Sequence, residues 1–225
     1  MRVIAGTARG RPLTGPAGPR TRPTSDKVKG ALFSILETLL AAERPGEAPA
    51  SAEPGTPELW EGLTVVDLYA GTGALGIEAL SRGAAWCDFV EANAAARRII
   101  ERNLRATGLD DRARVVGLDV EKVVRRTAHA ALHAPYDLTL MDPPYDDLTV
   151  SAVIGDLARS ALLVPRALVA VEHSRRLALS DEYDGLGVTR ERRYGDTVLS
   201  IYRDTAANDS GVTTDGHDGD LSRHV

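Results

Sequence analysis

Apolar residues near the N-terminus of the chain recur with the period of an α-helix. They occupy the i, i+3, i+4 and i+7 positions of one helix face, namely Val28, Ala31, Leu32, Ile35, Leu36, Leu39 and Leu40. The spacing predicts a helix over 24–42, with N-cap oxygens from the polar residues 24–26. Before this helix, two short apolar stretches on either side of Gly6 predict a small β-ribbon.

From Leu63 onward the pattern changes to short apolar runs that alternate with helical segments. The predicted strands are 64–69, 86–91, 113–117, 136–141 and 167–172, and the predicted helices are 74–82, 94–107, 119–131 and 148–160. Such alternation indicates a mostly parallel sheet with helices on both sides. Residues 188–194 and 197–203 flank Gly195-Asp196 and predict an antiparallel hairpin. The pattern therefore predicts an open, seven-stranded α/β sheet that ends in this hairpin.

Composition divides the chain further. Its 225 residues, 43% of them hydrophobic, predict one domain with a sizeable core. Residues 44–58 hold four prolines and are predicted to be a flexible insertion, whereas 204–225 are rich in Asp, Gly, Ser and Thr and are predicted to be a disordered acidic tail. We therefore expect an N-terminal extension at 1–43 and an α/β domain at 59–203.

The distribution of charge changes what the net charge implies. A net charge of −5 argues against a nucleic-acid partner. Residues 43–61 and 204–225, however, each carry −4, while residues 1–30 hold seven basic residues and one acidic residue, a local charge of +6. The N-terminal extension therefore fits an RNA backbone.

Other features exclude several classes of protein. The single cysteine, Cys87, excludes a disulfide framework, an iron–sulfur cluster and a cysteine-rich zinc site, and we interpret it as a core residue within a strand. His129 and His133 are four residues apart without a third ligand, so no metal site is expected. No apolar stretch reaches the roughly 18 residues of a membrane helix. No secretory leader opens the chain, so we expect a cytoplasmic protein without a membrane partner.

A glycine-rich turn between a predicted strand and a predicted helix indicates a binding site. Gly71, Gly73 and Gly76 match the pattern G-x-G-x-x-G, and Glu91 follows Gly71 by 20 residues at the end of the next strand. This combination is typical of a Rossmann-like site for an adenosine-containing ligand. The spacing alone fits NAD. The carboxylate of Asp67, however, would crowd a pyrophosphate and would suit the cationic amino-acid part of S-adenosylmethionine.

The tetrapeptide Asp142-Pro143-Pro144-Tyr145 follows the fourth predicted strand. In an open α/β sheet this loop faces the same crevice as the glycine turn. Consecutive prolines remove two N–H donors and leave a rigid array of acceptors, which suits the exocyclic amino group of a nucleobase. Hydrogen bonds to the Asp142 carboxylate and the Pro143 carbonyl would orient that nitrogen, and Tyr145 would stack on the base, a contact of roughly 1–3 kcal/mol.

These motifs together resemble the RsmD family of bacterial 16S ribosomal RNA guanine-N2 methyltransferases. The resemblance covers nearly all of the predicted folded part of the chain. It rests on Arg2–Gly6, Arg9–Arg11, Arg22–Val28, Leu32-Phe33, Asp67–Gly76, Gly83-Ala84, Asp142–Tyr145 and Tyr194–Thr197. Residues 44–58 and 204–225 have no match in the family pattern.

The resemblance implies an S-adenosylmethionine-dependent enzyme with a Rossmann-like class I methyltransferase domain. It would modify the N2 of a guanine in 16S rRNA, at guanine 966 in the family. The substrate would be the free rRNA, the 30S subunit or an assembly intermediate. We expect the enzyme to act as a monomer. The implied catalytic residues are Asp142, Pro143, Pro144 and Tyr145, and the implied RNA-binding residues are Arg9, Arg11, Arg20, Arg22 and Lys27. The implied cofactor-binding residues are Asp67, Tyr69, Gly71, Thr72, Gly73, Glu91 and Asp119. Among them, Glu91 would bind the ribose and Asp119 would bind the adenine.

Three alternatives stay open at this point. A nicotinamide-dependent oxidoreductase fits the glycine spacing. The sequence Asp-Pro-Pro-Tyr also occurs in adenine-N6 and other amino-group methyltransferases, so it does not determine the base. A non-catalytic RNA-binding module could retain the same fold.

Overall fold

A computed structural model describes residues 1–15, 26–43, 57–125, 131–145 and 147–204. Its centre is one eight-stranded sheet in the order β3-β2-β1-β4-β5-β8-β7-β6. The strands are β1 Thr64–Leu68, β2 Trp86–Val90, β3 Ala113–Val116, β4 Tyr136–Met141, β5 Leu163–Ser174, β6 Glu182–Tyr183, β7 Leu186–Tyr194 and β8 Thr197–Asp204. The first five strands pair in parallel and the last three are antiparallel, which confirms the predicted fold class.

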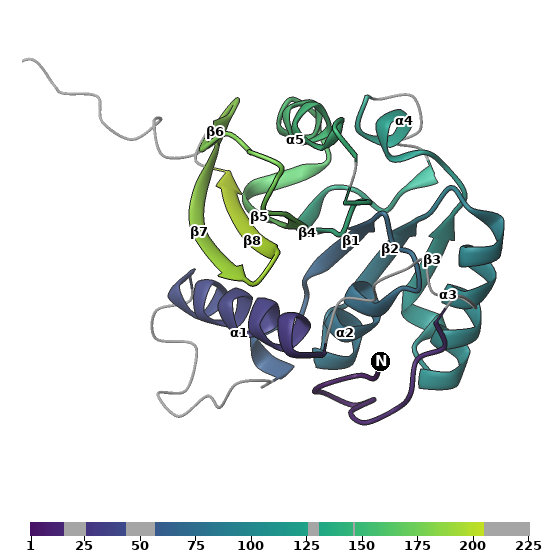
Figure 1. Ribbon diagram of the computed structural model, residues 1–225. Helices are drawn as coiled ribbons and strands as arrows, with labels where there is room; N and C mark the ends of the chain where they lie inside the picture. The colour runs from purple at the N-terminus through teal and green to yellow at the C-terminus, as the bar shows by residue number, and fades with distance from the viewer. Residues whose placement is uncertain (16–25, 44–56, 126–130, 146, 205–225) are drawn as a thin grey trace, which may run out of the picture.

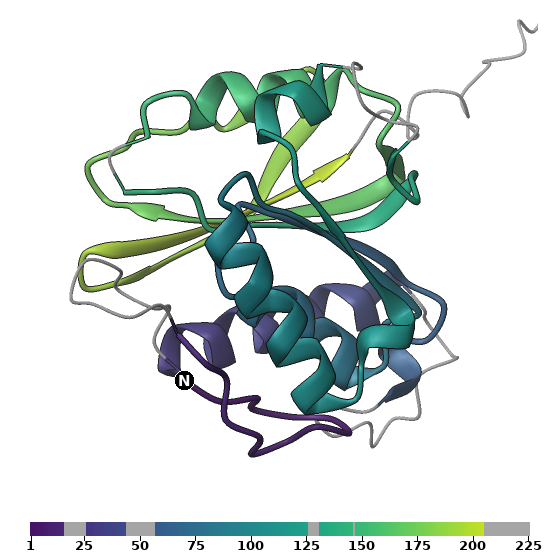
Figure 2. The same cartoon turned by 90° about the vertical axis from the view of Figure 1, so that its right-hand side faces the viewer.

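Helices cover both faces of this sheet (Figures 1 and 2). On one face lie α1 Asp26–Glu43, α2 Ala74–Arg82 and α3 Ala94–Thr107, and on the other lie α4 Val120–Val124 and α5 Val150–Ala158. Two short 3₁₀ turns, η1 Pro57–Leu59 and η2 Asp110–Arg112, precede β1 and β3. Each face buries its own apolar cluster, one around α1, α2 and α3 and one around α4 and α5. Strands that are apolar on both faces follow from this arrangement.

Several boundaries differ from the sequence predictions. The helix predicted over 119–131 ends at Val124 with Arg125 as its C-cap, because its buried residues stop at Val123 and Val124, and 126–130 lie outside the described residues. Strand β5 begins at Leu163 instead of residue 167, with a register shift opposite β4. The two-residue strand β6 adds an eighth strand to the seven predicted.

The ends of the predicted segments also shift. The predicted N-terminal ribbon is short: it holds one antiparallel bridge, between Arg2 and Pro12, and the N–H groups of Val3 and Leu13 donate across it to the carbonyls of Arg11 and Met1. The reason is that the N–H groups of Ile4 and Ala5 donate to the carboxylate of Glu78 on α2 and are not available for strand pairing. Asp204, predicted to begin the tail, is the last residue of β8. Most of the predicted insertion and tail, at 44–56 and 205–225, lies outside the described residues.

The N-terminal segment 1–14 lies against the C-terminal end of α2. Thr7 donates its N–H to the Ser81 carbonyl over 2.7 Å, and Ala8 donates to the Ser81 hydroxyl oxygen over 3.0 Å. Gly6 has a φ of 79°, and a Cβ atom at this position would overlap the Ser81 carbonyl. Only glycine therefore allows this close approach of the two backbones.

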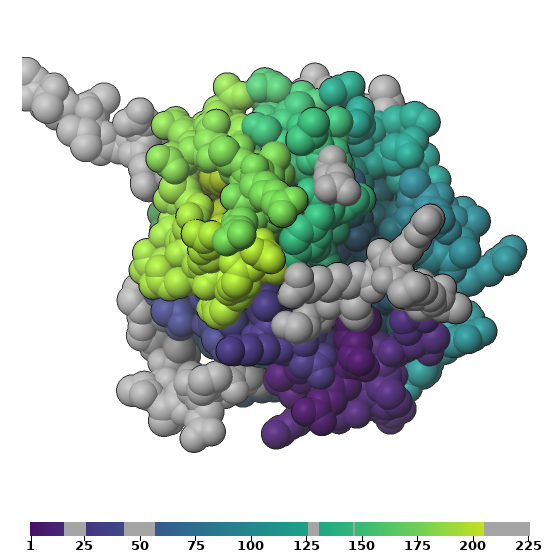
Figure 3. All heavy atoms as spheres, in the orientation of Figure 1, coloured from purple at the N-terminus to yellow at the C-terminus, as the bar shows by residue number. Residues whose placement is uncertain are grey.

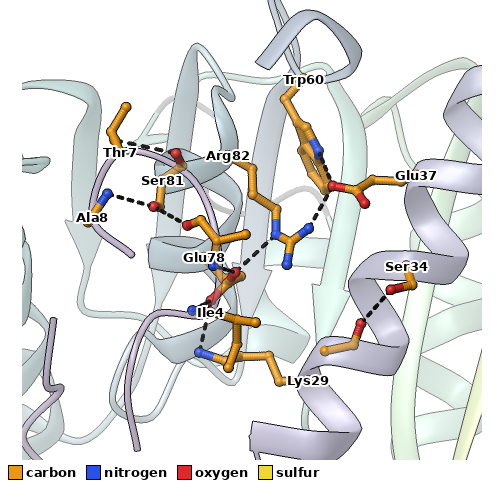
Figure 4. A network of polar contacts seen from close by, with 12 residues as sticks. Ile4, Thr7, Ala8, Lys29, Ser34, Glu37, Trp60, Glu78, Ser81 and Arg82 are labelled. Carbon is orange, nitrogen blue, oxygen red and sulfur yellow. Dashed lines mark hydrogen bonds and ion pairs between the residues drawn. The ribbon is translucent and has the colours of Figure 1, made fainter. Parts of the chain in front are cut away.

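A buried network of charged side chains connects this segment with α1 and α2 (Figure 4). Glu78 binds Lys29 of α1 over 3.0 Å and Arg82 over 3.0 Å, and none of these side chains is more than 5% exposed. Arg82 also binds Glu37 of α1 over 2.6 Å, and Lys29 donates to the Arg2 carbonyl over 2.7 Å. Two acids and two bases thus compensate one another where water is excluded.

The C-terminal hairpin of β7 and β8 lies next to α1 on the face shown in Figure 3. Arg203 of β8 donates to the Leu39 carbonyl of α1 over 3.5 Å, which fixes this contact. The extension and the C-terminal strands are therefore packed as parts of one body with the central sheet. Within the described ranges, no helix combines the length and apolar character needed to span a bilayer.

Replacing Glu78 tests whether the network holds this body together. We expect Glu78→Gln to lower the free energy of unfolding by about 3–5 kcal/mol, because it leaves two buried cations without their full countercharge. Asp26→Asn, which removes an exposed ion pair with Arg2, is the control and should cost less than about 1 kcal/mol. Urea unfolding of both variants measures the difference, and equal effects would contradict the interpretation.

Candidate functional site

The carboxyl ends of β2, β1 and β4 lie side by side because these strands are neighbours in a parallel sheet. The residues that follow these ends are Glu91 after β2, the glycine turn after β1 and Asp142 after β4. Glu91 accepts a hydrogen bond from the Gly71 N–H over 2.9 Å. The structure thus places the motifs predicted from the sequence at one edge of the sheet.

The glycine turn needs glycine for two different reasons. Gly71 and Gly73 have φ values of 56° and 77°, in the left-handed region that glycine adopts without strain. A Cβ at Gly76 would instead overlap the Phe89 ring of β2, so Gly76 permits close packing of α2 on the sheet. Gly73 is the N-cap of α2 and supplies no side-chain cap, so the helix presents backbone N–H groups at this end.

Asp67, the fourth residue of β1, is a buried carboxyl group beneath the glycine turn. Its Oδ2 accepts the Gly76 N–H over 2.9 Å, and the residue is 1% exposed. Burial raises the pKa of Asp67 to about 8, the Gly76 hydrogen bond opposes this shift, and the charges of Asp142 and Glu91 add to it. The pKa of Asp67 therefore depends in part on the two carboxylates that follow the neighbouring strands.

The charges at this edge of the sheet indicate whether the residues fit a cationic or an anionic cofactor. The charges of Glu91 and Asp142 repel that of an ionised Asp67, and this repulsion adds to burial, which is the larger cause of its raised pKa. A cation bound among them would lower this repulsion, whereas the pyrophosphate of a dinucleotide would increase it. The sulfonium and ammonium groups of S-adenosylmethionine fit, with Asp67, Glu91 and the glycine turn as the residues that would hold it.

The loop after β4 is held in place by contacts on both sides. Pro143 is buried, Asp142 and Tyr145 are half-buried, and the Tyr145 hydroxyl lies 2.6 Å from Oγ1 of Thr197 on β8. On the other side, the Tyr69 phenol hydrogen-bonds with Thr149 and Asp147, and burial and the Asp147 charge raise its pKa. Tyr69 itself has a φ of 61°, uncommon for a residue other than glycine. The segment that follows Asp142 thus contacts β8 through Tyr145 and the end of β1 through Tyr69.

Other predicted site residues lie farther from this centre or outside the described residues. The Asp119 carboxylate is more than half exposed and pairs with Lys122 over 2.9 Å, so its predicted contact with adenine stays a prediction. Arg9 and Lys27 are exposed, whereas the Arg11 guanidinium donates to the Ala106 carbonyl of α3 over 2.7 Å. Arg20 and Arg22 lie outside the described residues.

The sequence analysis missed Asn103, a buried residue of α3. Its Nδ2 donates to the Thr72 carbonyl in the glycine turn over 2.9 Å and to the Thr14 carbonyl over 3.0 Å. The signal was present in the sequence, because Asn103 lies between Ile100 and Leu104 on the apolar face of an amphipathic helix. A polar residue on such a face needs buried partners.

The single cysteine and one of the histidines are core residues. Cys87 is buried, and burial raises the pKa of its thiol, which disfavours a reactive thiolate. His173 is buried beside the Ser200 hydroxyl at 2.9 Å, and burial lowers the pKa of its ring. His133 is exposed, and His129 lies outside the described residues. Within the part of the chain that the structure describes, no three potential metal ligands gather.

Comparison with known proteins agrees with this geometry. A family model described as "Conserved hypothetical protein 95" matches residues 1–203. YlbH of Bacillus subtilis (strain 168) is 32% identical over 203 residues, which are 90% of this chain and 98% of that protein. Ribosomal RNA small subunit methyltransferase D of Escherichia coli (strain K12) is 28% identical over 210 residues, 93% of each chain. The solved structure of yhhF from Escherichia coli has a TM-score of 0.72 at 28% identity, covering 92% of this chain and 98% of its own.

The fold and the site define a Rossmann-like methyltransferase, the class whose cofactor is S-adenosylmethionine. The match to the family model covers both the N-terminal extension and the α/β domain. The chain belongs to the RsmD-like family.

The raised pKa of Asp67 predicts a pH dependence of stability. The folded protein holds this proton up to about pH 8, whereas the unfolded chain loses it near 3.8. Wild-type stability should therefore fall as pH rises between these values, with a contribution from this group of up to about 1.4 kcal/mol per pH unit. Asp67→Asn keeps an acceptor for Gly76 and should flatten this slope in urea unfolding measured from pH 5 to 8. A slope identical to that of the wild type would contradict the assignment.

Proposed function

We propose that this protein transfers a methyl group from S-adenosylmethionine to the exocyclic N2 of a guanine in 16S rRNA. The observation that carries the proposal is the rigid Asp142–Tyr145 loop beside the glycine turn, with Glu91 and Asp67 at the same edge. Membership of the RsmD-like family and the rRNA methyltransferase name of the Escherichia coli relative support it. The equivalent of guanine 966 is the proposed position.

The acceptors of the loop determine what it does to an amino group. The Asp142 carboxylate and the Pro143 carbonyl accept the two N–H hydrogens of the base, which turns the nitrogen lone pair toward the glycine turn. S-adenosylmethionine supplies, when bound there, an electrophilic methyl group on a sulfonium sulfur. Asp142 then takes the proton that the nitrogen releases, so orientation and one proton acceptor supply the catalysis.

Tyr145 provides the surface on which the base stacks. Its hydroxyl is bonded to Thr197, so the ring keeps its orientation before the base arrives. The guanine has to leave its own stack to reach Asp142, and stacking on Tyr145 offsets part of that cost. Exposed basic residues of the extension, Arg9 and Lys27, would contact the RNA backbone.

The same arrangement disfavours the alternative of a nicotinamide-dependent oxidoreductase. Asp67, Glu91 and Asp142 lie at the same edge of the sheet as the glycine turn, where ionised carboxylates would repel an anionic pyrophosphate. Because ribosomal subunits are the proposed substrate, we place the activity in the cytoplasm, on free 16S rRNA or on the 30S subunit. A single chain holds every residue named in the proposal, and a monomer stays our prediction.

Loss of the Asp142 carboxylate should abolish transfer but not cofactor binding. For Asp142→Ala we expect a fall in kcat of about 10²–10⁴-fold, because both orientation and proton acceptance are lost. Mass spectrometry of nucleosides from 30S subunits lacking the modification would show N2-methylguanosine with the wild type and not with the variant. Asp111→Ala, on the exposed turn η2, is the control.

This experiment also separates the alternatives. Formation of N6-methyladenosine instead would show that the target base is adenine and not guanine. Undiminished N2-methylguanosine with Asp142→Ala would contradict the proposed role of the loop. Binding of NAD and not of S-adenosylhomocysteine would favour the oxidoreductase.

The two parts of Tyr145 should be separable by substitution. Tyr145→Ala removes the stacking surface and should weaken RNA binding by roughly 1–3 kcal/mol, about 5- to 150-fold. Tyr145→Phe keeps the ring and loses the hydroxyl that contacts Thr197, so it should weaken RNA binding less than Tyr145→Ala. Titration of 30S subunits with each variant measures these affinities, and equal effects of Tyr145→Ala and Tyr145→Phe would exclude stacking as the main contribution.

A further inference from the structure

Asn103 connects two segments that have different roles in the proposed function. Its side chain is buried in α3 and makes three hydrogen bonds. Nδ2 donates to the carbonyls of Thr14, at the end of the N-terminal segment, and of Thr72, in the glycine turn, over 3.0 Å and 2.9 Å. Oδ1 accepts the Thr14 N–H over 2.8 Å. One amide group therefore bridges the two backbones.

The hydrogen bonds of this amide leave it no freedom to reorient. A carboxamide has two N–H donors, and both are used by Thr14 and Thr72. If the amide were flipped, its oxygen would face the carbonyls of Thr14 and Thr72, and its NH2 group would face the Thr14 N–H. A displacement of Thr14 must therefore either move Asn103 or break buried hydrogen bonds. The position of Thr14 is transmitted to the Thr72 carbonyl.

Further contacts make α3 a shared support for both segments. The Arg11 guanidinium donates to the Ala106 carbonyl over 2.7 Å, three residues beyond Asn103. At the other end, a Cβ on Gly73 would come within 3.1 Å of Ile100, so the glycine turn packs tightly on the same helix. The N-terminal segment and the glycine turn thus meet on one face of α3.

We propose that Asn103 is a positioning residue that couples RNA binding by the N-terminal segment to cofactor binding at the glycine turn. The inference rests on the proposed function, which gives the segment its RNA partner and the turn its cofactor. RNA that contacts the segment favours one position of Thr14, and through Asn103 it favours the corresponding position of the Thr72 carbonyl in the turn. A ligand at either end then favours the arrangement that the other ligand needs, so the coupling is positive.

Equilibrium binding measures the coupling directly. Radiolabelled S-adenosylhomocysteine, which cannot react, is titrated by equilibrium dialysis into the full-length protein with and without saturating 30S subunits that lack the modification. For the wild type we expect the subunits to raise the affinity at least 5-fold, within the roughly 5- to 150-fold of typical allosteric coupling. S-adenosylhomocysteine should raise the affinity for the subunits by the same factor, because coupling of binding free energies is reciprocal.

Two variants disrupt this bridge, one at Asn103 and one at Thr14. Asn103→Ala removes all three bonds and should reduce the ratio of the two affinities to below about 2-fold. Thr14→Pro deletes the N–H that Oδ1 accepts and leaves the Asn103 side chain in place, so it should also reduce this ratio. Thr14→Ala is the matched control, because the Thr14 side chain is exposed and the backbone bonds remain. Thr14→Pro keeps the test available if Asn103→Ala does not fold.

The outcomes distinguish this inference from the proposed function. A ratio that both variants leave at the wild-type value overturns the coupling through Asn103, and so does an equal loss in Thr14→Ala. A wild type that methylates 30S subunits with a ratio near one overturns the coupling and leaves the proposed function intact. A wild type that neither binds S-adenosylhomocysteine nor methylates the subunits overturns both.

Discussion

The rest of the structure depends on the buried ion pairs and hydrogen bonds of the Glu78 carboxylate. It lies in the middle of α2, the helix whose N-terminus forms the glycine turn, and it binds Lys29 and Arg82 where water is excluded. The same carboxylate accepts the N–H groups of Ile4 and Ala5. Because a buried carboxylate is tolerated only with its partners in place, α2, α1 and the N-terminal segment must assemble together. The proposed RNA-binding extension is therefore fixed relative to the cofactor turn.

Charge has opposite effects in the two parts of the molecule. Around Glu78, acids and bases are balanced and hold three segments together. At the carboxyl edge of the sheet, Asp67, Glu91 and Asp142 are gathered, and the charges of Glu91 and Asp142 add to burial, the main cause of the raised pKa of Asp67. The first arrangement stabilises the fold, whereas the second keeps unfavourable energy at the site that a cationic cofactor would relieve.

The sequence predicts the features that depend on local periodicity. The strands, the glycine turn, Glu91 and the Asp142 loop follow from short patterns, and the structure brings them together because the order of a parallel α/β sheet places those loops at one edge. Asn103, the Arg82–Glu37 pair and the Tyr145–Thr197 contact join residues 31 to 89 positions apart. No local pattern encodes such pairings. The shortness of the N-terminal ribbon was not predictable for the same reason, since the N–H groups of Ile4 and Ala5 bind Glu78 on a distant helix.

The contact between Tyr145 and Thr197 has a consequence for how the protein matures. Thr197 is the first residue of β8, the strand that lies between β5 and β7 and is the last described element of the chain. During synthesis the glycine turn and the Asp142 loop leave the ribosome well before this strand does. A nascent chain therefore has all the residues proposed for catalysis before it has the hydroxyl that orients Tyr145. The orientation of the Tyr145 ring is therefore completed only after β8 has been synthesised and has paired with β5.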